Sequence, residues 1–277
     1  MPALLSEDQA TQYERDGLVW PIRVFSADVA TTIRTKLETA EAADGGPFSG
    51  TLRFKPHLLY TFLDDIIRHA KVLDAVEDVI GANILCWSSA FFTKEARDTG
   101  YVSWHQDSTY WGLSAPDVTT AWVALTPSTR ANGCMRAIPG THTSDQIGHI
   151  DTHAAKNMLT RGQVVDVEVD DAEAVDIELQ PGEMSLHHVR LIHGSEANPS
   201  DDRRIGFAIR YIPPNLRQIN GARDSAGLVR GIDSFGHFEH EPKPAADCHP
   251  DAVAWHAKAA EIQSQLLYQE TKRRPFS

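Results

Sequence analysis

The sequence predicts a single, mainly β domain: an antiparallel sandwich or barrel with helices at both ends. Residues 83–212 consist of short runs rich in Val, Ile, Trp, Phe and Thr, separated by Gly, Pro, Asn and Asp and with no helices between them. The segments on either side space their apolar residues as helices do. The chain of 277 residues shows no internal repeat and no linker, which fits one domain over residues 1–277.

The N-terminal part, residues 1–82, is predicted to be helical. Ser6 and Gln9 form a capping box that marks the start of the first helix, and Ser26 can cap the second. Apolar periodicity and the glycines that follow it predict helical segments at residues 6–16, 26–44 and 58–80. We expect their apolar stripes to pack into the core rather than to bind a partner.

Residues 83–212 carry the predicted strands. Nine segments combine β-prone residues with flanking turns: 84–92, 102–105, 119–125, 135–138, 163–169, 174–179, 183–187, 191–195 and 205–212. Residues 164–178 alternate Val or Ile with seven acidic residues, which we interpret as solvated strand faces rather than a cation site. Residues 213–248 lack periodicity and are predicted to be a loop or lid. Residues 249–277 are predicted to form a C-terminal helix, with helical spacing from 250 to 272.

Composition restricts the partners and the compartment. The formal net charge is −12, and the only basic cluster lies at residues 272–274. This charge argues against nucleic acid or an anionic membrane as a partner and leaves a small-molecule substrate. The three cysteines lie far apart, and no apolar run approaches the ~18 residues of a membrane span. We therefore expect a soluble, cytoplasmic protein; the sequence does not predict its oligomeric state.

The 13 histidines raise the question of which ones do chemistry. His105 and Asp107 lie two residues apart at the end of a predicted strand, so both side chains can reach one metal ion. His193 follows another β run and can supply a third ligand. Two histidines and one carboxylate leave open positions at ferrous iron. A His-x-Asp pair alone is weak evidence, because a histidine at a strand end is more often structural; His187 and His188 are expected to shape the sheet end.

Arg204 adds to this signal. It follows His193 by eleven residues, past a polar turn, and a hairpin could return it to the sheet beside that histidine. A guanidinium held there can form a bidentate pair with a carboxylate. Arg203 competes for the role, but strand parity and spacing favour Arg204.

These residues give the chain a resemblance to a known family. The matching residues are 105–107 (His-Gln-Asp), 121–125 (Ala-Trp-Val-Ala-Leu), 132–135 (Asn-Gly-Cys-Met), 139–142 (Pro-Gly-Thr-His), 193–195 (His-Gly-Ser), Asn198 and Arg204. In order and spacing they resemble the phytanoyl-CoA dioxygenase family of Fe(II)- and 2-oxoglutarate-dependent oxygenases, over about residues 5–212. The resemblance implies a double-stranded β-helix, a cupin-like jelly roll, as the core at residues 83–212.

The resemblance also implies the roles of individual residues. The iron ligands, and with them the catalytic residues, are His105, Asp107 and His193. Arg204 pairs with the distal carboxylate of 2-oxoglutarate near Ser195, while Gln106 and Trp122 line the cosubstrate pocket; O₂ takes the last metal position. Related halogenases have a small residue at the position of Asp107, so its carboxylate favours hydroxylation over chlorination.

The substrate is less clearly indicated. Tyr110 and Trp111 directly follow the metal strand, and Tyr60 can add aromatic surface, although plain core packing explains these rings equally well. Such rings suit an apolar chain or an alkylammonium group. Arg210 is one of several arginines and lysines that can anchor an anionic headgroup.

Residues 104–113 look closest to bacterial hydroxylases of small polar metabolites, including the aminoalkylphosphonate hydroxylases. The leading candidate is hydroxylation next to phosphorus in 2-aminoethylphosphonate or its N-trimethyl form. A free amino acid, an osmolyte or an acyl thioester is an alternative substrate. From a different class, a cupin-like metal-binding protein that is not an oxygenase stays open, and Arg204 argues against it.

Overall fold

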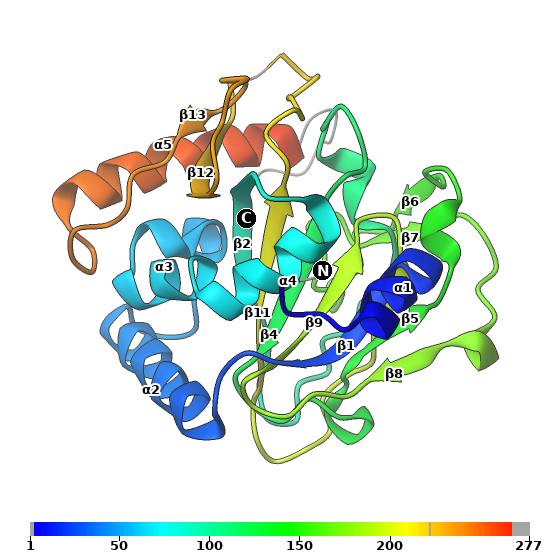
Figure 1. Ribbon diagram of the computed structural model, residues 1–277. Coiled ribbons are helices and arrows are strands. Elements are labelled where there is room, and N and C mark those ends of the chain that lie inside the picture. The colour runs from blue at the N-terminus through cyan, green and yellow to red at the C-terminus, as the bar shows by residue number, and fades with distance from the viewer. Residues whose placement is uncertain (1–2, 222, 268–277) are drawn as a thin grey trace.

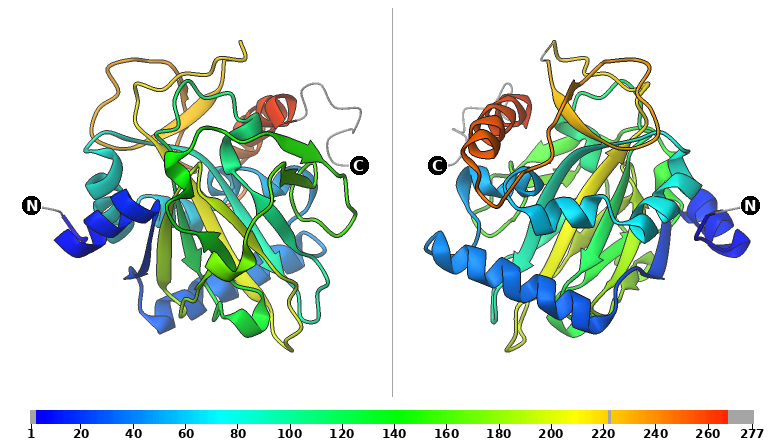
Figure 2. Two further views of the ribbon diagram at one scale, coloured as in Figure 1. Left: turned by 90° about the vertical axis from the view of Figure 1, so that its right-hand side faces the viewer. Right: turned by 60° about the vertical axis from the view of Figure 1, so that its left-hand side comes forward.

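The computed structural model describes residues 3–221 and 223–267, which form two facing β-sheets with helices on one side (Figures 1 and 2). The helices are α1 (Glu7–Asp16), α2 (Ala27–Ala43), α3 (Thr61–Ile67), α4 (Ala70–Ile80) and α5 (Pro250–Leu267). The strands are β1 (Leu18–Arg23), β2 (Ile84–Lys94), β3 (Val102–His105), β4 (Thr119–Ala124), β5 (Met135–Ile138), β6 (His149–Asp151), β7 (Gln163–Val165), β8 (Val175–Ile177), β9 (Glu183–His188), β10 (Ile192–Ser195), β11 (Arg204–Ile212), β12 (Ser225–Arg230) and β13 (Glu239–His240).

The large sheet has seven strands in the order β1-β9-β4-β11-β2-β12-β13, and the small sheet has four in the order β3-β10-β5-β8. Strands β6 and β7 form a separate two-stranded sheet. All pairs are antiparallel except β12 with β13. This arrangement confirms the predicted mainly β jelly roll.

The two faces of the large sheet have different surroundings: one packs against helices and the other faces the small sheet. On β11 the residues Ile205, Phe207, Ile209 and Tyr211 belong to the main hydrophobic core, together with α2, α3 and α4. Figure 2 shows these helices lying across that face of the sheet. Alternate residues of a strand point to opposite faces, so Arg204, Gly206, Ala208 and Arg210 face the small sheet. The interior between the sheets is therefore where β11 presents its two arginines.

The N-terminal helices agree with the capping signals. Ser6 and Gln9 form the reciprocal capping box at 3.1 Å in both directions, and Ser26 Oγ accepts from Val29 N. The predicted helix at 58–80 is divided into α3 and α4. At the break His69 is extended and packs its ring on Phe25, a tertiary contact that helical periodicity does not reveal.

Several strands lie outside the predicted set. β1 pairs with β9. β12 lies inside segment 213–248, which was predicted to be a loop or lid throughout, and pairs with β2. Both are short, and their burial comes from distant partners rather than from strict alternation in the sequence. The last residues of the predicted C-terminal helix, and the basic cluster at 272–274, lie outside the described residues.

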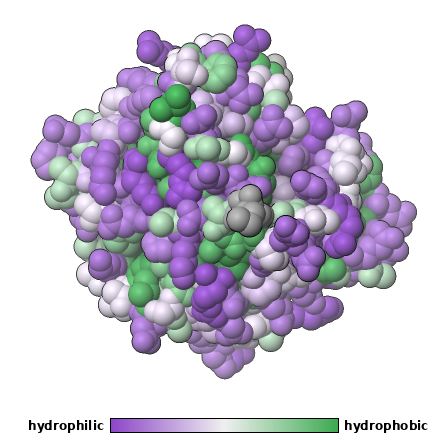
Figure 3. Space-filling model, viewed as in Figure 1, coloured by the Kyte–Doolittle hydropathy of each residue, from purple (hydrophilic) through white to green (hydrophobic). Residues whose placement is uncertain are grey.

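The surface and the cysteines give few further constraints. On the face in Figure 3 hydrophilic residues predominate and hydrophobic ones form small groups. None of the described helices is both long and apolar enough to span a bilayer. Cys86, Cys134 and Cys248 are free thiols.

Candidate active site

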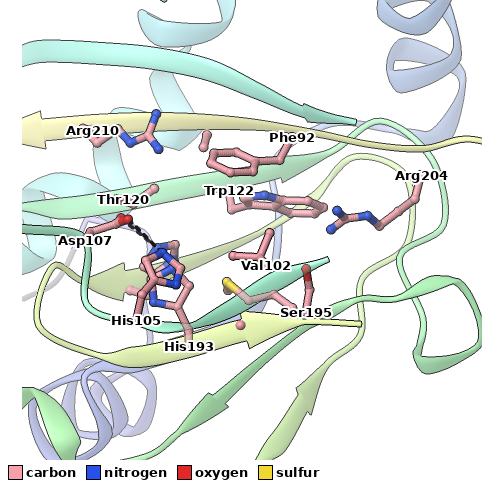
Figure 4. A pocket seen from close by; sticks show the side chains of 14 residues that line it. Phe92, Val102, His105, Asp107, Thr120, Trp122, His193, Ser195, Arg204 and Arg210 are labelled. Atoms are coloured by element: carbon pink, nitrogen blue, oxygen red, sulfur yellow. Dashed lines mark ion pairs between the residues drawn. The ribbon is translucent and has the colours of Figure 1, made fainter. Parts of the chain in front are cut away.

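Two histidines and one aspartate meet between the sheets. His105 ends β3, and His193 lies opposite it in the register of β10, so their rings are 4.2 Å apart between centroids. Asp107 begins the turn after β3, and its Oδ1 is 3.3 Å from His105 Nε2 (Figure 4). One ligand atom from each residue lies within 4.8 Å of the others. The structure therefore brings together the three predicted ligands.

Backbone carbonyls fix the tautomers of both histidines. His105 Nδ1 is 2.9 Å from Ser103 O, and His193 Nδ1 is 2.9 Å from Leu191 O. A carbonyl can only accept, so each Nδ1 carries the hydrogen and each Nε2 keeps its lone pair for a metal. Burial holds the pKa of His193 well below its usual range, which keeps this imidazole neutral. The donor set fits a divalent metal such as ferrous iron.

Asp107 supplies the anionic ligand. Burial alone would raise the pKa of its carboxyl, but the neighbouring side chains of His105 and His193 and the charge of Arg210 outweigh this effect. The pKa of Asp107 is therefore well below its usual range, and the group is a carboxylate at neutral pH.

Arg204 lies at the other end of the same cavity, beside Trp122 and Ser195 (Figure 4). Its guanidinium is 5.3 Å from the Trp122 ring, and its Nε has no hydrogen-bond partner among the described residues. Burial lowers the pKa of Arg204 to about 10, so the group remains charged at neutral pH. A buried guanidinium without an anion fits the carboxylate of a cosubstrate.

Lys94 lies beside the Arg204 end of the cavity and was not among the site residues predicted from the sequence. It is fully buried and pairs with Arg204 in the register of β2 and β11. Its Nζ donates to Ser195 Oγ at 2.7 Å and to the carbonyl of Glu196. Burial, helped by the charge of Arg204, lowers the pKa of Lys94 to about 7. Only the pairing of two distant strands reveals this neighbour.

Gln106 is not brought to this cavity. Its Nε2 donates to Arg190 O at 2.8 Å, and its Oε1 accepts from Ile147 N at 2.8 Å and from Gln146. As the residue between His105 and Asp107, it points away from the side that they share.

A second cavity adjoins the first and shares Phe92, Asp107 and Arg210 with it. Of the predicted substrate residues, Tyr110, Trp111 and Arg210 line this second cavity. Its other walls include Phe54, Trp87, Phe91, Leu159 and, from α5, Gln263. None of the described residues of segment 213–248 lines either cavity.

Tyr60 is the predicted substrate residue that the structure places elsewhere. Its ring stacks on Phe48 at 5.3 Å and belongs to the hydrophobic core on the helical side of the large sheet. An aromatic residue near the start of a helix looks the same in sequence whether it faces a cavity or the core.

His187 also lines the metal cavity, where the sequence indicated only a structural role. Its Nε2 is 3.9 Å from Asp107 Oδ2. Burial lowers the pKa of His187 to about 4, so the imidazole is neutral at physiological pH.

A jelly roll with two histidines and one carboxylate at one mouth defines the class to which the non-haem iron oxygenases belong. The chain belongs to the phytanoyl-CoA dioxygenase (PhyH) family, whose model matches residues 13–206. This confirms the family that the sequence motifs indicated.

Two named relatives match part of the chain. A probable alpha-ketoglutarate-dependent hypophosphite dioxygenase of Stutzerimonas stutzeri is 30% identical over 66% of this chain and 61% of its own length. An ectoine dioxygenase of Bordetella parapertussis is 27% identical over 50% of each chain. The chain thus matches between half and two thirds of the length of these relatives.

Solved structures match over more of the chain. A non-haem monooxygenase, ThoJ in its apo form, is 32% identical with a TM-score of 0.85, covering 95% of this chain and 98% of that one. CytC3 with Fe(II) and alpha-ketoglutarate, that is 2-oxoglutarate, is 26% identical with a TM-score of 0.62, covering 86% and 93%.

Proposed function

We propose that this protein is an Fe(II)- and 2-oxoglutarate-dependent dioxygenase that hydroxylates an unactivated carbon of a small polar metabolite. One observation carries the proposal: a single buried cavity holds the three metal ligands at one end and the unpaired Arg204 at the other. A metal-binding protein that uses no carboxylate cosubstrate would leave the buried charge of Arg204 without a binding partner. The non-oxygenase alternative is therefore disfavoured.

Different residues of the cavity bind the metal and the cosubstrate. His105, Asp107 and His193 would hold the iron, and three protein ligands would leave room at the metal for the cosubstrate and O₂. Bound iron, with 2-oxoglutarate and O₂, supplies the oxidant that inserts one oxygen atom into a substrate C–H bond, while the other oxygen atom enters succinate as CO₂ leaves. Arg204 and Ser195 bind the distal carboxylate, and the Trp122 ring forms the wall beside it. The buried cavity walls exclude bulk water, which strengthens these charged contacts.

We further infer that the substrate is a small metabolite with an anionic group, with 2-aminoethylphosphonate or its N-trimethyl form as the leading candidate. Arg210 and the aromatic walls of the second cavity support this, since they suit an anion and an ammonium group together. The relative named for hypophosphite, a small phosphorus oxyanion, also supports it. The relative named for ectoine keeps an amino acid or osmolyte as the alternative, and an acyl thioester as a further one. The three free cysteines support a reducing, cytoplasmic location.

The test is anaerobic addition of Fe(II) and 2-oxoglutarate, followed by visible spectroscopy. We expect a metal-to-ligand charge-transfer band in the wild-type protein and a much higher 2-oxoglutarate requirement in Arg204→Ala. Absence of the band, or unchanged 2-oxoglutarate affinity in Arg204→Ala, contradicts the assignment. A screen of succinate formation over phosphonates, amino acids, betaines and acyl thioesters then identifies the substrate.

A further inference from the structure

Three polar residues form a row across the large sheet inside the metal cavity. Arg210 of β11 is the register partner of Thr120 of β4, and Thr120 is the register partner of His187 of β9. All three side chains line the cavity. We call these residues the Arg210 row.

Each member of the Arg210 row has a buried polar atom without a hydrogen-bond partner in the part of the chain that the structure describes. These atoms are Arg210 Nε, Thr120 Oγ1 and His187 Nδ1. The residues are 7%, 1% and 2% exposed. An unsatisfied buried polar group costs about 1–3 kcal/mol, and such groups are few in folded proteins. Three adjacent ones on a cavity wall point to a ligand that completes them.

The cosubstrate leaves this row free. Figure 4 shows Arg210 on the side of Asp107 and Arg204 at the opposite end of the cavity. Between them Ala208 lines the cavity, and the ring of Trp122 covers Gly206, so this ring lies between the two guanidinium groups. In the proposed function the distal carboxylate of 2-oxoglutarate is held at Arg204 and the other end binds the metal. The charge of Arg210 is near the Asp107 carboxylate, but the two form no ion pair, and in the proposed function Asp107 binds the metal. Arg210 is therefore able to bind a further anion.

The surroundings of Arg210 hold its side chain in place for such an anion. The guanidinium is 5.6 Å from the centroids of both the Phe92 and the Trp111 rings, an arrangement typical of cation–π contact. Asp107 pairs with His105 at 3.3 Å and serves the metal site. Arg210 and Asp107 also line the second cavity, so an anion at the row is reached from the substrate side.

We propose that Arg210, Thr120 and His187 form the binding site for the anionic oxyacid group of the substrate, a phosphonate or a carboxylate. This inference rests on the proposed function and specifies its substrate class. Because His187 is 3.9 Å from Asp107, an oxyacid group bound at the row places the carbon attached to it beside the metal. The Arg210 row therefore also determines that the carbon next to the oxyacid group is hydroxylated.

Binding of two simple anions tests the site. The probes are methylphosphonate and acetate, titrated calorimetrically into the protein loaded anaerobically with Fe(II) and 2-oxoglutarate. We expect the wild-type protein to bind at least one probe and Arg210→Met to bind it about tenfold or more weakly, because a charge-assisted hydrogen bond is lost. Thr120→Val keeps the shape of the side chain and should weaken binding about threefold or more, through the loss of one neutral hydrogen bond. The preferred probe identifies the oxyacid.

Two controls separate this inference from the proposed function. Arg130→Met removes a positive charge whose side chain is 70% exposed and lines neither cavity, and it should bind the probes as the wild type does. Titration of the charge-transfer band measures the 2-oxoglutarate affinity of every variant. This affinity should stay within about twofold of the wild-type value in Thr120→Val and Arg210→Met.

Three results overturn the site. The wild-type protein binds neither probe; Arg210→Met and Thr120→Val bind the probes as tightly as the wild type; or Arg210→Met loses 2-oxoglutarate to the same extent, which assigns the row to the cosubstrate. In the first two cases an intact charge-transfer band leaves the proposed function standing. If the wild-type protein shows no band at all, the proposed function itself fails.

Discussion

His105 and His193 face each other across the antiparallel pair β3–β10, and each donates its Nδ1 hydrogen to a backbone carbonyl two residues earlier in the chain. Both imidazoles are therefore oriented by their own strands before any metal arrives. The third ligand, Asp107, depends instead on the turn after β3. The contribution of Asp107 can accordingly be removed without disturbing the two histidines.

Asp107→Ala should lose iron and hydroxylation. The variant removes the only carboxylate of the three-residue metal cluster, and we expect iron affinity to fall by about 100-fold or more, beyond what loss of an outer partner costs. Iron content after equilibrium dialysis and succinate formation measure the effect. Asp145→Ala, which changes a fully exposed carboxylate, is the control and should behave as the wild type. Full iron loading of Asp107→Ala would remove this residue from the triad.

Lys94 should make 2-oxoglutarate binding depend on pH. The pKa of Lys94 is lowered to about 7, so its ammonium is lost as pH rises through neutrality. A carboxylate bound at Arg204, the register partner of Lys94, favours the charged form. We expect 2-oxoglutarate affinity to fall by up to about tenfold between pH 7 and pH 8.5, because binding takes up a proton in that range.

Lys94→Met tests this expectation, because it keeps the length of the side chain and removes the charge. Its 2-oxoglutarate affinity at pH 7 should be lower than that of the wild type and should change little up to pH 8.5. Calorimetry in buffers with different ionisation enthalpies measures the proton uptake directly. The same pH dependence in Lys94→Met as in the wild type would assign the titration to another group.

Gly206→Ala should damage the cosubstrate end. A Cβ at this position would overlap the Trp122 ring, which lines the cavity beside Arg204. Overpacking of this kind costs about 1–3 kcal/mol, and the displaced ring should lower 2-oxoglutarate affinity as well. Thermal unfolding and the charge-transfer band give the two readouts. Gly148→Ala is the matched control, since the nearest atom to its added Cβ is 4.0 Å away; equal effects of the two variants would refute the overlap.

His187 should make the metal-free protein less stable in acid. Its pKa is about 4 in the folded protein, against about 6.5 in an unfolded chain. Between these values the unfolded chain binds a proton that the folded protein does not, so the free energy of unfolding falls as pH drops. From pH 7 to pH 5 the loss is about 2 kcal/mol.

Urea unfolding at pH 7 and pH 5 measures this loss. His187→Gln should show a smaller loss than the wild type, whereas His237→Gln, a change on the surface, should show the same loss. If His187→Gln and the wild type lose stability equally, other groups account for the acid sensitivity.

The metal ligands and Arg204 were readable from the sequence because each signal is local. His105 and Asp107 share one side of a strand end. The predicted hairpin from His193 to Arg204 was wrong, because β10 and β11 lie in different, facing sheets. The connection between them nevertheless brings Arg204 to the same cavity as His193. Lys94, Thr120 and His187 were not readable as site residues, because their positions depend on which strands pair and in which register. Their partners lie on strands far away in the chain.

The same reasoning explains the fold-level differences. The strands β2 to β5 are bounded by turn residues and enriched in β-prone ones, so their predicted ranges agree closely with the structure. β12 is recognisable only through its pairing with β2. Tyr60 illustrates the converse case, since periodicity indicates burial but not whether a ring faces the core or a cavity.

β11 is buried along all nine of its residues, with apolar side chains toward the helices and two arginines toward the cavity. Inserting or deleting one residue in this strand would reverse every side chain, placing guanidinium groups in the apolar core and large apolar groups beside the iron. We therefore expect a one-residue change in the length of this strand to disrupt the site, whereas single side chains along it can be exchanged without displacing the others. The loops at the ends of the sheets are the places where chain length can vary while the chemistry is kept.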